Sequence, residues 1–419
     1  MENERGEIIA CEVCENQLEQ VKSQVGMSEE EFELLKTPRK SLLVNFPIKL
    51  DNGDVRVISA LRVQYNDALG PTKGGVRFHE SVDFDEVSKL AFLMSLKTSL
   101  VGLPYGGAKG AVKINPKNFS RAELERISRA FVREMKEFIG PRKDIPAPDV
   151  NTNPQIMAWM MDEYERIFGE KSPGVITGKP VELGGSLGRN KSTAKGAFYV
   201  IEKIYQDVRD KSSIKVAIQG FGNAGSNLAL MLHNAKFKVV AVSDSRAGVY
   251  NPDGLNIPEL IEFKNKKMPF SDYAKEGEII TNEDLIKLEV DLLIPAALGD
   301  VISEKNADEV KAKRIVEVAN GPITPKADLI LESKGVEIIP DILANSGGVI
   351  VSYFEQVQNL ATYYWSEEEV DNKLKDKIIS AYERVLEEKA SLNAKSFRTA
   401  SYSLAIKRIL EAERLRGNL

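Results

Sequence analysis

Three lysines and one aspartate in the first half of the chain have the side chains needed for acid–base chemistry on an anionic ligand. The lysines are Lys73, Lys97 and Lys109, which lie among Gly, Leu, Phe, Met and Pro, and Asp149 follows in a proline-rich segment. A buried cation needs a partner, so several together predict a pocket for a small, multiply negative molecule. For any one lysine alone, the alternative is a side chain whose ammonium group reaches solvent.

Lys109 is the candidate base of this pocket. It follows Gly106-Gly107-Ala108 and precedes Gly110, so its backbone can approach a ligand closely. A catalytic lysine must be neutral part of the time, although the free side chain has a pKa of about 10.4. Burial and the like charges of Lys73 and Lys97 are expected to lower this pKa. Asp149 is the candidate partner in proton transfer.

A second candidate site lies in the middle of the chain, between two strand-like runs at 215–219 and 238–242. A G-x-G-x-x-G fingerprint follows the first run and opens a helix, and Asp244 follows the second run. This context favours a dinucleotide site over a plain glycine turn, with the phosphates at the helix N-terminus and Asp244 accepting hydrogen bonds from the adenosine ribose. The fingerprint residues are Gly220, Phe221, Gly222, Asn223, Ala224 and Gly225.

The sequence leaves the choice of coenzyme open between NAD and NADP. Asp244 favours NAD, because its carboxylate repels a 2′-phosphate. Ser245 and Arg246 come next, and both are able to bind that phosphate.

Length and charge restrict the class of protein. A chain of 419 residues predicts two domains. The net charge of −5 argues against nucleic-acid binding. The absence of a long apolar run argues against a membrane span, and the polar, acidic N-terminus argues against a signal peptide. We therefore expect a cytoplasmic protein.

The cysteines, Cys11 and Cys14, form a single C-x-x-C near the N-terminus. The chain contains only two histidines, so the further ligands for a structural zinc site are scarce, and no metal is expected. A redox motif would be expected between a strand and a helix instead. The prediction is one helical turn that carries two thiols.

Periodicity predicts an α/β fold. Capping boxes at Ser28/Glu31, Ser120/Glu123 and Ser366/Glu369 start helices. Two strand-like runs flank a hairpin turn at 51–54, and a loop rich in proline is expected at 145–150. From residue 214 onward strands and helices alternate, which predicts a parallel, doubly wound sheet of the Rossmann type.

Several motifs together resemble the glutamate dehydrogenases of the compact, hexameric bacterial and archaeal type, within the wider glutamate, leucine, phenylalanine and valine dehydrogenase superfamily. The resemblance covers nearly the whole chain. Its motifs are Lys73-Gly-Gly-Val-Arg-Phe-His79, Leu103-Pro-Tyr-Gly-Gly-Ala-Lys-Gly110, Pro146-Ala-Pro-Asp149, Ser243-Asp-Ser245, Asn251-Pro-Asp-Gly254, Ala319-Asn-Gly-Pro322 and Asn345-Ser-Gly-Gly-Val349.

The resemblance implies a role for each candidate residue. Lys109 would be the base that activates water, Asp149 would handle protons, and Lys97 would bind the substrate α-carboxylate. Lys73 with Ser352 would bind the side-chain carboxylate, which points to glutamate, because a charged pair facing an alkyl chain stays unsatisfied. The resemblance also implies cofactor contacts at Thr193, Ala319, Asn320 and Asn345.

The expected reaction is the reversible oxidative deamination of L-glutamate to 2-oxoglutarate and ammonia, with NAD or NADP as the hydride acceptor, in a homohexamer. An N-terminal α/β domain at 1–183 would hold the substrate and the subunit interface. A Rossmann domain would span 184–393, and a helix at 394–419 would return to the first domain. The alternatives are a leucine, phenylalanine or valine dehydrogenase, which Lys73 and Ser352 oppose, and a non-enzymatic nucleotide-binding regulator, which Lys109 and Asp149 oppose.

Overall fold

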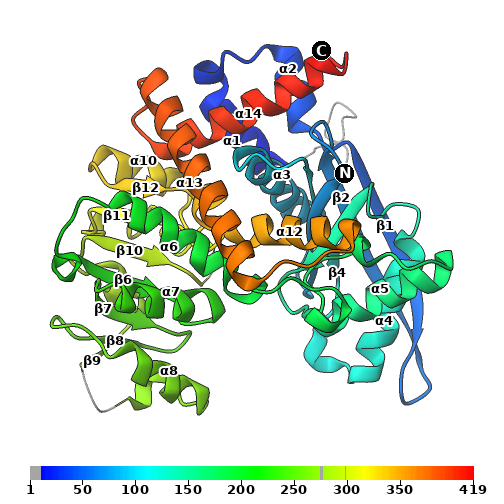
Figure 1. Ribbon diagram of the computed structural model, residues 1–419, viewed down its shortest axis with the longest axis horizontal. Coiled ribbons are helices and arrows are strands. Elements are labelled where there is room, and N and C mark those ends of the chain that lie inside the picture. Colours follow the sequence, from blue (N-terminus) through cyan, green and yellow to red (C-terminus); the bar gives the residue numbers. More distant parts are fainter. Residues whose placement is uncertain (1–10, 274–276, 298) are drawn as a thin grey trace. The chain divides into compact units, whose positions relative to one another are not determined.

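The computed structural model describes residues 11–273, 277–297 and 299–419. They form two compact units (Figure 1). Unit 1 runs to Arg189 and also includes Val349–Asp371 and Tyr402–Leu419, whereas unit 2 consists of Asn190–Gly348 and Asn372–Ser401.

These units are less contiguous than the predicted domains, whose limits are 183 and 393. The segment with Ser352 lies in unit 1, and the chain changes units inside the helices α12 (Gly347–Ala361), α13 (Glu367–Ser391) and α14 (Phe397–Leu415). A helix that continues from one unit into the next carries no break in composition, so the sequence offers no signal at these points.

Unit 1 contains a mixed sheet of five strands in the order β1-β2-β4-β3-β5. The hairpin β1–β2 is antiparallel, as the turn at 51–54 predicts, and β3 lies parallel to both β4 and β5. Long side chains of α4 and α5 pack with β1, β2 and β4 in one hydrophobic core. The strands are β1 (Lys40–Lys49), β2 (Val55–Asn66), β3 (Thr72–Phe78), β4 (Gly106–Val112) and β5 (Asp144–Pro148).

The loop predicted in the proline-rich segment is wrong, because β5 occupies it. Its residues pair with β3, including Gly74 with Pro146 and Val76 with Pro148. Proline cannot donate a ladder hydrogen bond, but β5 is an edge strand, where one side needs no donor. Strand β5 ends immediately before Asp149 and so fixes where that carboxylate begins.

Two helices of unit 1 begin where the capping boxes predict. Ser28 and Glu31 cap α2, and Ser120 and Glu123 cap α4, each with both reciprocal hydrogen bonds. Besides parts of α12, α13 and α14, the helices are α1 (Glu12–Val25), α2 (Glu29–Lys36), α3 (Phe84–Leu100), α4 (Arg121–Met135) and α5 (Pro154–Phe168).

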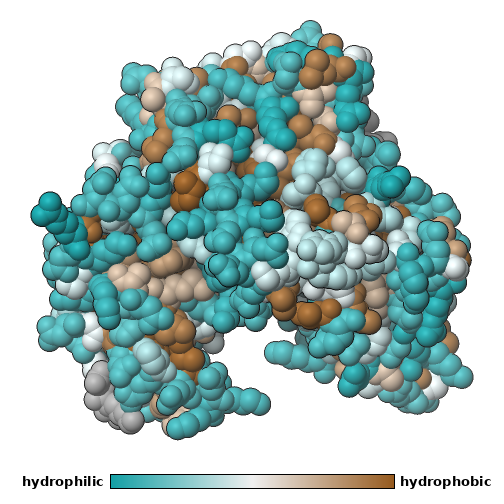
Figure 2. Space-filling view, viewed as in Figure 1, coloured by the Kyte–Doolittle hydropathy of each residue, from teal (hydrophilic) through white to brown (hydrophobic). Residues whose placement is uncertain are grey.

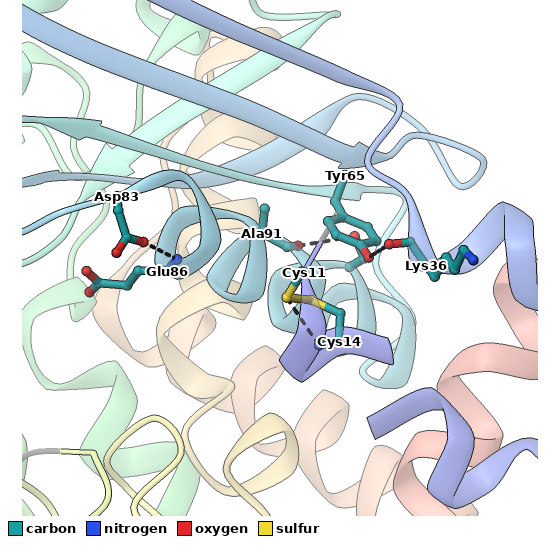
Figure 3. Close-up of a disulfide and its surroundings, with 8 residues drawn as sticks. Cys11, Cys14, Lys36, Tyr65, Asp83, Glu86 and Ala91 are labelled. Atoms are coloured by element: carbon teal, nitrogen blue, oxygen red, sulfur yellow. Dashed lines mark hydrogen bonds between the residues drawn. A yellow bond between two sulfur atoms is a disulfide. The ribbon is translucent and has the colours of Figure 1, made fainter. Parts of the chain in front are cut away.

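The two cysteines form a disulfide, so the prediction of two thiols in a helical turn is wrong. Cys11 is the N-cap of α1 rather than part of the helix, and its Sγ accepts a hydrogen bond from the backbone N–H of Cys14. Their Cα atoms are 5.2 Å apart, within reach of a disulfide. Both residues are buried where α1 packs on α3 (Figure 3).

Unit 2 contains a sheet of seven strands in the order β12-β11-β10-β6-β7-β8-β9, drawn mainly in green and yellow in Figure 1. The five strands from β12 to β7 are parallel, as predicted. The antiparallel strands β8 and β9 extend one edge and were not predicted. The strands are β6 (Lys215–Gln219), β7 (Lys238–Ser243), β8 (Gly248–Tyr250), β9 (Glu278–Ile280), β10 (Leu292–Pro295), β11 (Arg314–Val316) and β12 (Glu337–Ile339).

The helices of unit 2 follow the alternation that the sequence indicates. Apolar residues of β6, β7, β10 and β11 pack with α9 and α10 in one core. The helices are α6 (Ser192–Ile204), α7 (Asn223–Asn234), α8 (Ile257–Asn265), α9 (Asn282–Ile286), α10 (Pro325–Ser333) and α11 (Asp341–Ala344), followed by most of α13.

Hydrophilic residues dominate the face shown in Figure 2, with smaller hydrophobic areas between them. Among the described residues, none of the helices has the length and apolar character required to cross a membrane.

Candidate active site

Glycines allow the strands beneath the candidate site to approach closely. A Cβ at Gly74 would lie 1.5 Å from the carbonyl oxygen of Ala108, and a Cβ at Gly75 would lie 2.7 Å from the Cβ of Asp149. A side chain at either position would therefore push β3 away from β4 or displace Asp149. The Gly-Gly pair after Lys73 brings the strand with Lys73, the strand with Lys109 and the carboxylate of Asp149 together.

Lys109 and Asp149 form an ion pair, as the prediction of a proton-transfer pair requires. Lys109 Nζ lies 2.9 Å from Asp149 Oδ2, and both side chains are largely buried. Arg77 Nε donates a second hydrogen bond to the same oxygen at 3.0 Å. Arg77 also pairs with Glu86 at the start of α3, so it holds Asp149 from a fixed position.

Opposing effects set the pKa values of this pair. Burial lowers the pKa of Lys109, Asp149 raises it, and the positive charges of Arg77 and Arg62 lower it again, with a net decrease. Burial would raise the pKa of Asp149, but Lys109 and Arg77 hold it below its usual value. The pair therefore combines an ionised carboxylate with a lysine that loses its proton more easily than in water.

Lys73 contacts the hydroxyl of Thr177 in the way that Lys109 contacts the carboxylate of Asp149. Its Nζ donates to Thr177 Oγ1 at 2.6 Å, and the hydroxyls of Thr177 and Ser352 are also 2.6 Å apart. Lys73 is 1% exposed and Ser352 is 2% exposed. We call Lys73, Thr177 and Ser352 the hydroxyl subsite. The structure brings the predicted pair Lys73 and Ser352 together, with Thr177 as the bridge.

Burial also affects the pKa of Lys73. It lowers the pKa of this lysine well below its ordinary value, and the positive charges of Arg189, Lys179 and Arg62 lower it further, whereas Glu355 raises it. An anion placed beside Nζ would favour the charged form. The hydroxyl subsite is therefore suited to receive a carboxylate from a ligand.

Lys97 lies in the last turn of α3 and is buried. A cation is favourable at a helix C-terminus, where the carbonyl groups carry partial negative charge. Helix α3 packs closely on β4, because a Cβ at Gly107 would lie 2.1 Å from the backbone nitrogen of Ser95. Gly107 is also the register partner of Lys73. The same unit therefore contains all three predicted lysines together with Asp149 and Ser352.

The residues that connect this site were not predicted from the sequence. Thr177 bridges the hydroxyl subsite, and Arg77 holds Asp149. Arg77 lies inside the motif 73–79, but the motif alone gave it no role. Lys179 and Glu355 contribute further buried charge, and Arg189 is a partly buried cation. Gly178 and Lys179 follow Thr177, so that a lysine again lies next to a glycine, as at Lys73 and Lys109. That pattern could have drawn attention to Thr177, but its partner lies 175 positions further along the chain.

The dinucleotide fingerprint in unit 2 has the geometry that its glycines predict. Gly220 has φ +100°, and a Cβ at Gly225 would lie 1.9 Å from the carbonyl oxygen of Gly220. A Cβ at Gly222 would meet no atom within 4 Å. The space beside Gly222 at the N-terminus of α7 is therefore open to a phosphate group, and the residues present fit a dinucleotide.

The other fingerprint positions support this turn. Phe221 is buried against Phe270, with ring centroids 5.3 Å apart, and Asn223 Nδ2 donates to the carbonyl oxygen of Asn190 at 2.7 Å. Ala224 lies in the first turn of α7.

Asp244 lies just beyond β7, at the carboxyl edge of the sheet. Its side chain accepts hydrogen bonds from the backbone N–H groups of Arg246 and Ala247 and pairs with Lys264 at 2.6 Å. Burial opposes the charge, but these donors lower the pKa of Asp244 overall. Ser245 and Arg246 are exposed. The carboxylate is ionised and is held by hydrogen bonds from two backbone N–H groups and by Lys264.

The remaining predicted cofactor residues lie in unit 2. Asn345 Nδ2 donates to the carbonyl oxygen of Ala319 at 3.3 Å and to Asn320 Oδ1 at 3.0 Å. Thr193 lies in the first turn of α6 and is partly buried. The structure therefore joins Ala319, Asn320 and Asn345 in one cluster and places Thr193 on a separate helix.

Two family models match the chain. Residues 184–417 match the glutamate/leucine/phenylalanine/valine dehydrogenase model, and residues 38–166 match the dimerisation domain of these dehydrogenases. The chain belongs to this family. Membership agrees with the resemblance that the motifs indicate.

Relatives within this family match nearly the full chain. A catabolic NAD-specific glutamate dehydrogenase of Bacillus subtilis is 48% identical over 94% of this chain and 92% of its own length. A glutamate dehydrogenase of Thermotoga maritima is 47% identical over 97% and 98%, respectively.

Solved structures of family members have the same fold. The hetero-hexameric glutamate dehydrogenase of Thermus thermophilus, in a leucine-bound form, superposes with a TM-score of 0.90 and 35% identity over 96% of this chain and 95% of that one. The glutamate dehydrogenase of Peptoniphilus asaccharolyticus gives 0.85 and 38% over 97% and 99%. The two-domain α/β fold predicted from the sequence is confirmed.

Proposed function

We propose that this protein is a glutamate dehydrogenase that converts L-glutamate reversibly to 2-oxoglutarate and ammonia, with NAD or NADP as the hydride carrier. Family membership and the names of relatives at 47–48% identity support the enzyme class. Within the family, the hydroxyl subsite is the observation that carries the choice of glutamate.

The hydroxyl subsite suits a substrate with a second carboxylate. An ammonium and two hydroxyls, all buried, offer several hydrogen-bond donors to an anion. An alkyl side chain in the same place would offer these donors no acceptor and would give the buried Lys73 no anion to favour its charged form. A leucine, phenylalanine or valine dehydrogenase is therefore the less favoured alternative.

The proposed division of tasks starts with the two substrate carboxylates. Lys97 binds the α-carboxylate, and Lys73 with Ser352 binds the side-chain carboxylate. Fixing both ends of a five-carbon substrate orients the bond at Cα, which lowers the entropic cost of reaching the transition state. The fingerprint residues and Asp244 would hold a nicotinamide dinucleotide, which would supply the acceptor for the hydride at Cα.

Lys109 and Asp149 then handle the protons. Neutral Lys109 removes a proton from water as the water oxygen attacks the imine carbon of the oxidised substrate. Asp149, which is ionised, first accepts a proton from the substrate ammonium group and later returns it to the departing nitrogen, so that ammonia leaves and the carbonyl of 2-oxoglutarate forms. The lowered pKa of Lys109 and the ionised state of Asp149 support these roles.

Assembly and location complete the proposal. We propose a homohexamer, because the solved Thermus thermophilus relative is hexameric and residues 38–166 match a dimerisation domain. We also propose that the enzyme acts in the cytoplasm. Light scattering and cell fractionation test these two statements.

The test of function is the oxidation of NADH or NADPH by the purified protein with ammonia and either 2-oxoglutarate or 4-methyl-2-oxopentanoate. Turnover with 2-oxoglutarate alone supports the proposal, and the two coenzyme rates give the preference. Turnover with the apolar keto acid alone would instead identify a leucine-type dehydrogenase. Silence with both substrates would favour a nucleotide-binding regulator.

A further inference from the structure

One face of α12 carries both Ser352 of the hydroxyl subsite and Glu355, one member of a buried ion pair. Ser352, Glu355 and Asn359 follow each other at helical spacing, so they lie on the same side of the helix. All three contact the segment 176–184 of the same unit. Thr177 of the hydroxyl subsite lies in that segment.

Glu355 binds the backbone directly after Thr177. Its carboxylate accepts hydrogen bonds from the N–H of Gly178 at 2.9 Å and from the N–H of Lys179 at 3.3 Å. It also pairs with Lys179 Nζ at 2.7 Å, with both side chains fully buried. Gly178 has φ +82°, and this turn conformation presents the two N–H groups to one carboxylate.

Lys179 closes the contact from the other side. Its Nζ donates to the carbonyl oxygen of Ile176 at 2.8 Å and to Asn359 Oδ1 at 2.7 Å, in addition to Glu355. Asn359 in turn donates to the carbonyl oxygen of Gly184 at 2.6 Å. Hydrogen bonds therefore hold the residues on both sides of Thr177. Glu355 binds Gly178, and Lys179, which is paired with Glu355, binds Ile176.

We propose that Glu355 and Lys179 are positioning residues that hold Thr177 against Ser352 and so shape the hydroxyl subsite for the distal carboxylate of the substrate. This inference rests on the proposed function, because it assumes a dicarboxylate substrate. Neither residue needs to touch the substrate. They act by fixing the distances between the ammonium of Lys73 and the hydroxyls of Thr177 and Ser352.

Glu355 has a second effect, through its charge. It is the acidic group that favours the charged form of Lys73, against burial and against Arg189, Lys179 and Arg62. Removing this charge lowers the pKa of Lys73, so that Lys73 loses its proton, and with it the attraction for a carboxylate, at a lower pH.

The test compares two keto acids of equal chain length in Glu355→Gln. One is 2-oxoglutarate, and the other is 2-oxopentanoate, which has a methyl group in place of the distal carboxylate. We expect the KM for 2-oxoglutarate to rise about tenfold, as for the loss of one charge-assisted contact, with little change in kcat. The KM for 2-oxopentanoate should stay within about twofold.

The pH profile and a matched control separate positioning from general destabilisation. In Glu355→Gln the rise of KM for 2-oxoglutarate with pH should begin at a lower pH than in the wild type. Glu413→Gln removes another fully buried glutamate of unit 1, which pairs with Arg39. This control should lower the melting temperature and leave the ratio of the two KM values unchanged.

Asn359→Ala provides a second variant that keeps the buried ion pair. It should raise the KM for 2-oxoglutarate by about fivefold, the effect of one net hydrogen bond, again without changing that for 2-oxopentanoate. Equal losses for both keto acids, or a wild-type KM ratio in both variants, would overturn the positioning role. A wild-type enzyme that does not prefer 2-oxoglutarate would overturn the proposed function and the inference together.

Discussion

Lys73 and Lys109 lie on adjacent parallel strands and are both buried, yet their surroundings differ. Lys109 has a carboxylate partner in Asp149 at 2.9 Å, whereas Lys73 has the hydroxyl of Thr177 at 2.6 Å. A lysine with its own carboxylate is equipped to exchange protons. A lysine that is hydrogen-bonded to a hydroxyl can still form an ion pair with a carboxylate of the ligand.

The same comparison is the reason for proposing different roles for two lysines in similar strands. The glycines between them let β3, β4 and Asp149 approach, so Asp149 reaches Lys109. Helix α12 brings Ser352 to the hydroxyl subsite instead. The proposed role of each lysine depends on the group that the fold places beside it.

Removing Lys109 should have the largest effect on turnover. Lys109→Ala is expected to lower kcat by about 10⁴-fold, because a positioned base contributes up to about that factor. Dinucleotide binding, measured by nicotinamide fluorescence, should stay at the wild-type level. Lys113→Ala is the control, since this neighbouring lysine is exposed. Near-wild-type activity in Lys109→Ala would remove it as the base.

Changing the hydroxyl subsite should alter substrate choice. Lys73→Leu combined with Ser352→Val is expected to lower kcat/KM for 2-oxoglutarate by about 10³-fold, through loss of one charged and one neutral contact. Activity with 4-methyl-2-oxopentanoate should rise relative to it. The measurement is kcat/KM for both keto acids. An unchanged preference for 2-oxoglutarate would contradict the role of Lys73 and Ser352 in binding its distal carboxylate.

Asp149→Asn should slow turnover and shift its pH dependence. We expect kcat to fall about 100-fold through loss of proton transfer. Asp149 raises the pKa of Lys109, so its removal lowers that pKa further. The neutral base then forms at lower pH, and the acid limb of kcat/KM should move to lower pH. A shift to higher pH would contradict the ion pair.

Thr177→Val should give the smallest of these effects. The variant keeps the shape of the side chain and removes one hydroxyl. We expect KM for 2-oxoglutarate to rise about tenfold, because Lys73 loses a neutral partner and the substrate loses an organised subsite. Steady-state kinetics at fixed ammonia and coenzyme measure it. A change in kcat alone would place Thr177 with the proton-transfer pair instead.

Much of the fold could be predicted because its signals are local. The capping boxes at Ser28 and Ser120 and the strand–helix–strand pattern around the fingerprint each lie within a few residues. Strand β5 was predicted as a loop because prolines disfavour strands, and only the edge position of β5 makes them acceptable. The disulfide depends on the N-cap position of Cys11, which spacing alone does not specify.

The candidate site was predictable only in part, for a related reason. Lysines in glycine-rich surroundings are visible in the sequence, and so is the dinucleotide fingerprint. The contacts of Thr177, Arg77 and Glu355 form only when distant segments meet, as with Thr177 and Ser352. Their roles depend on three-dimensional neighbours rather than on local patterns.

The most direct test of the difference between the two lysines is the dissociation constant of glutarate, measured by calorimetry in the wild type and in Lys73→Leu and Lys109→Ala. Glutarate has both carboxylates but no reacting group, so turnover does not enter. We predict about 100-fold weaker binding in Lys73→Leu, from loss of a charged hydrogen bond, and a change of less than about threefold in Lys109→Ala. Equal losses in the two variants, or a loss confined to Lys109→Ala, would contradict the account.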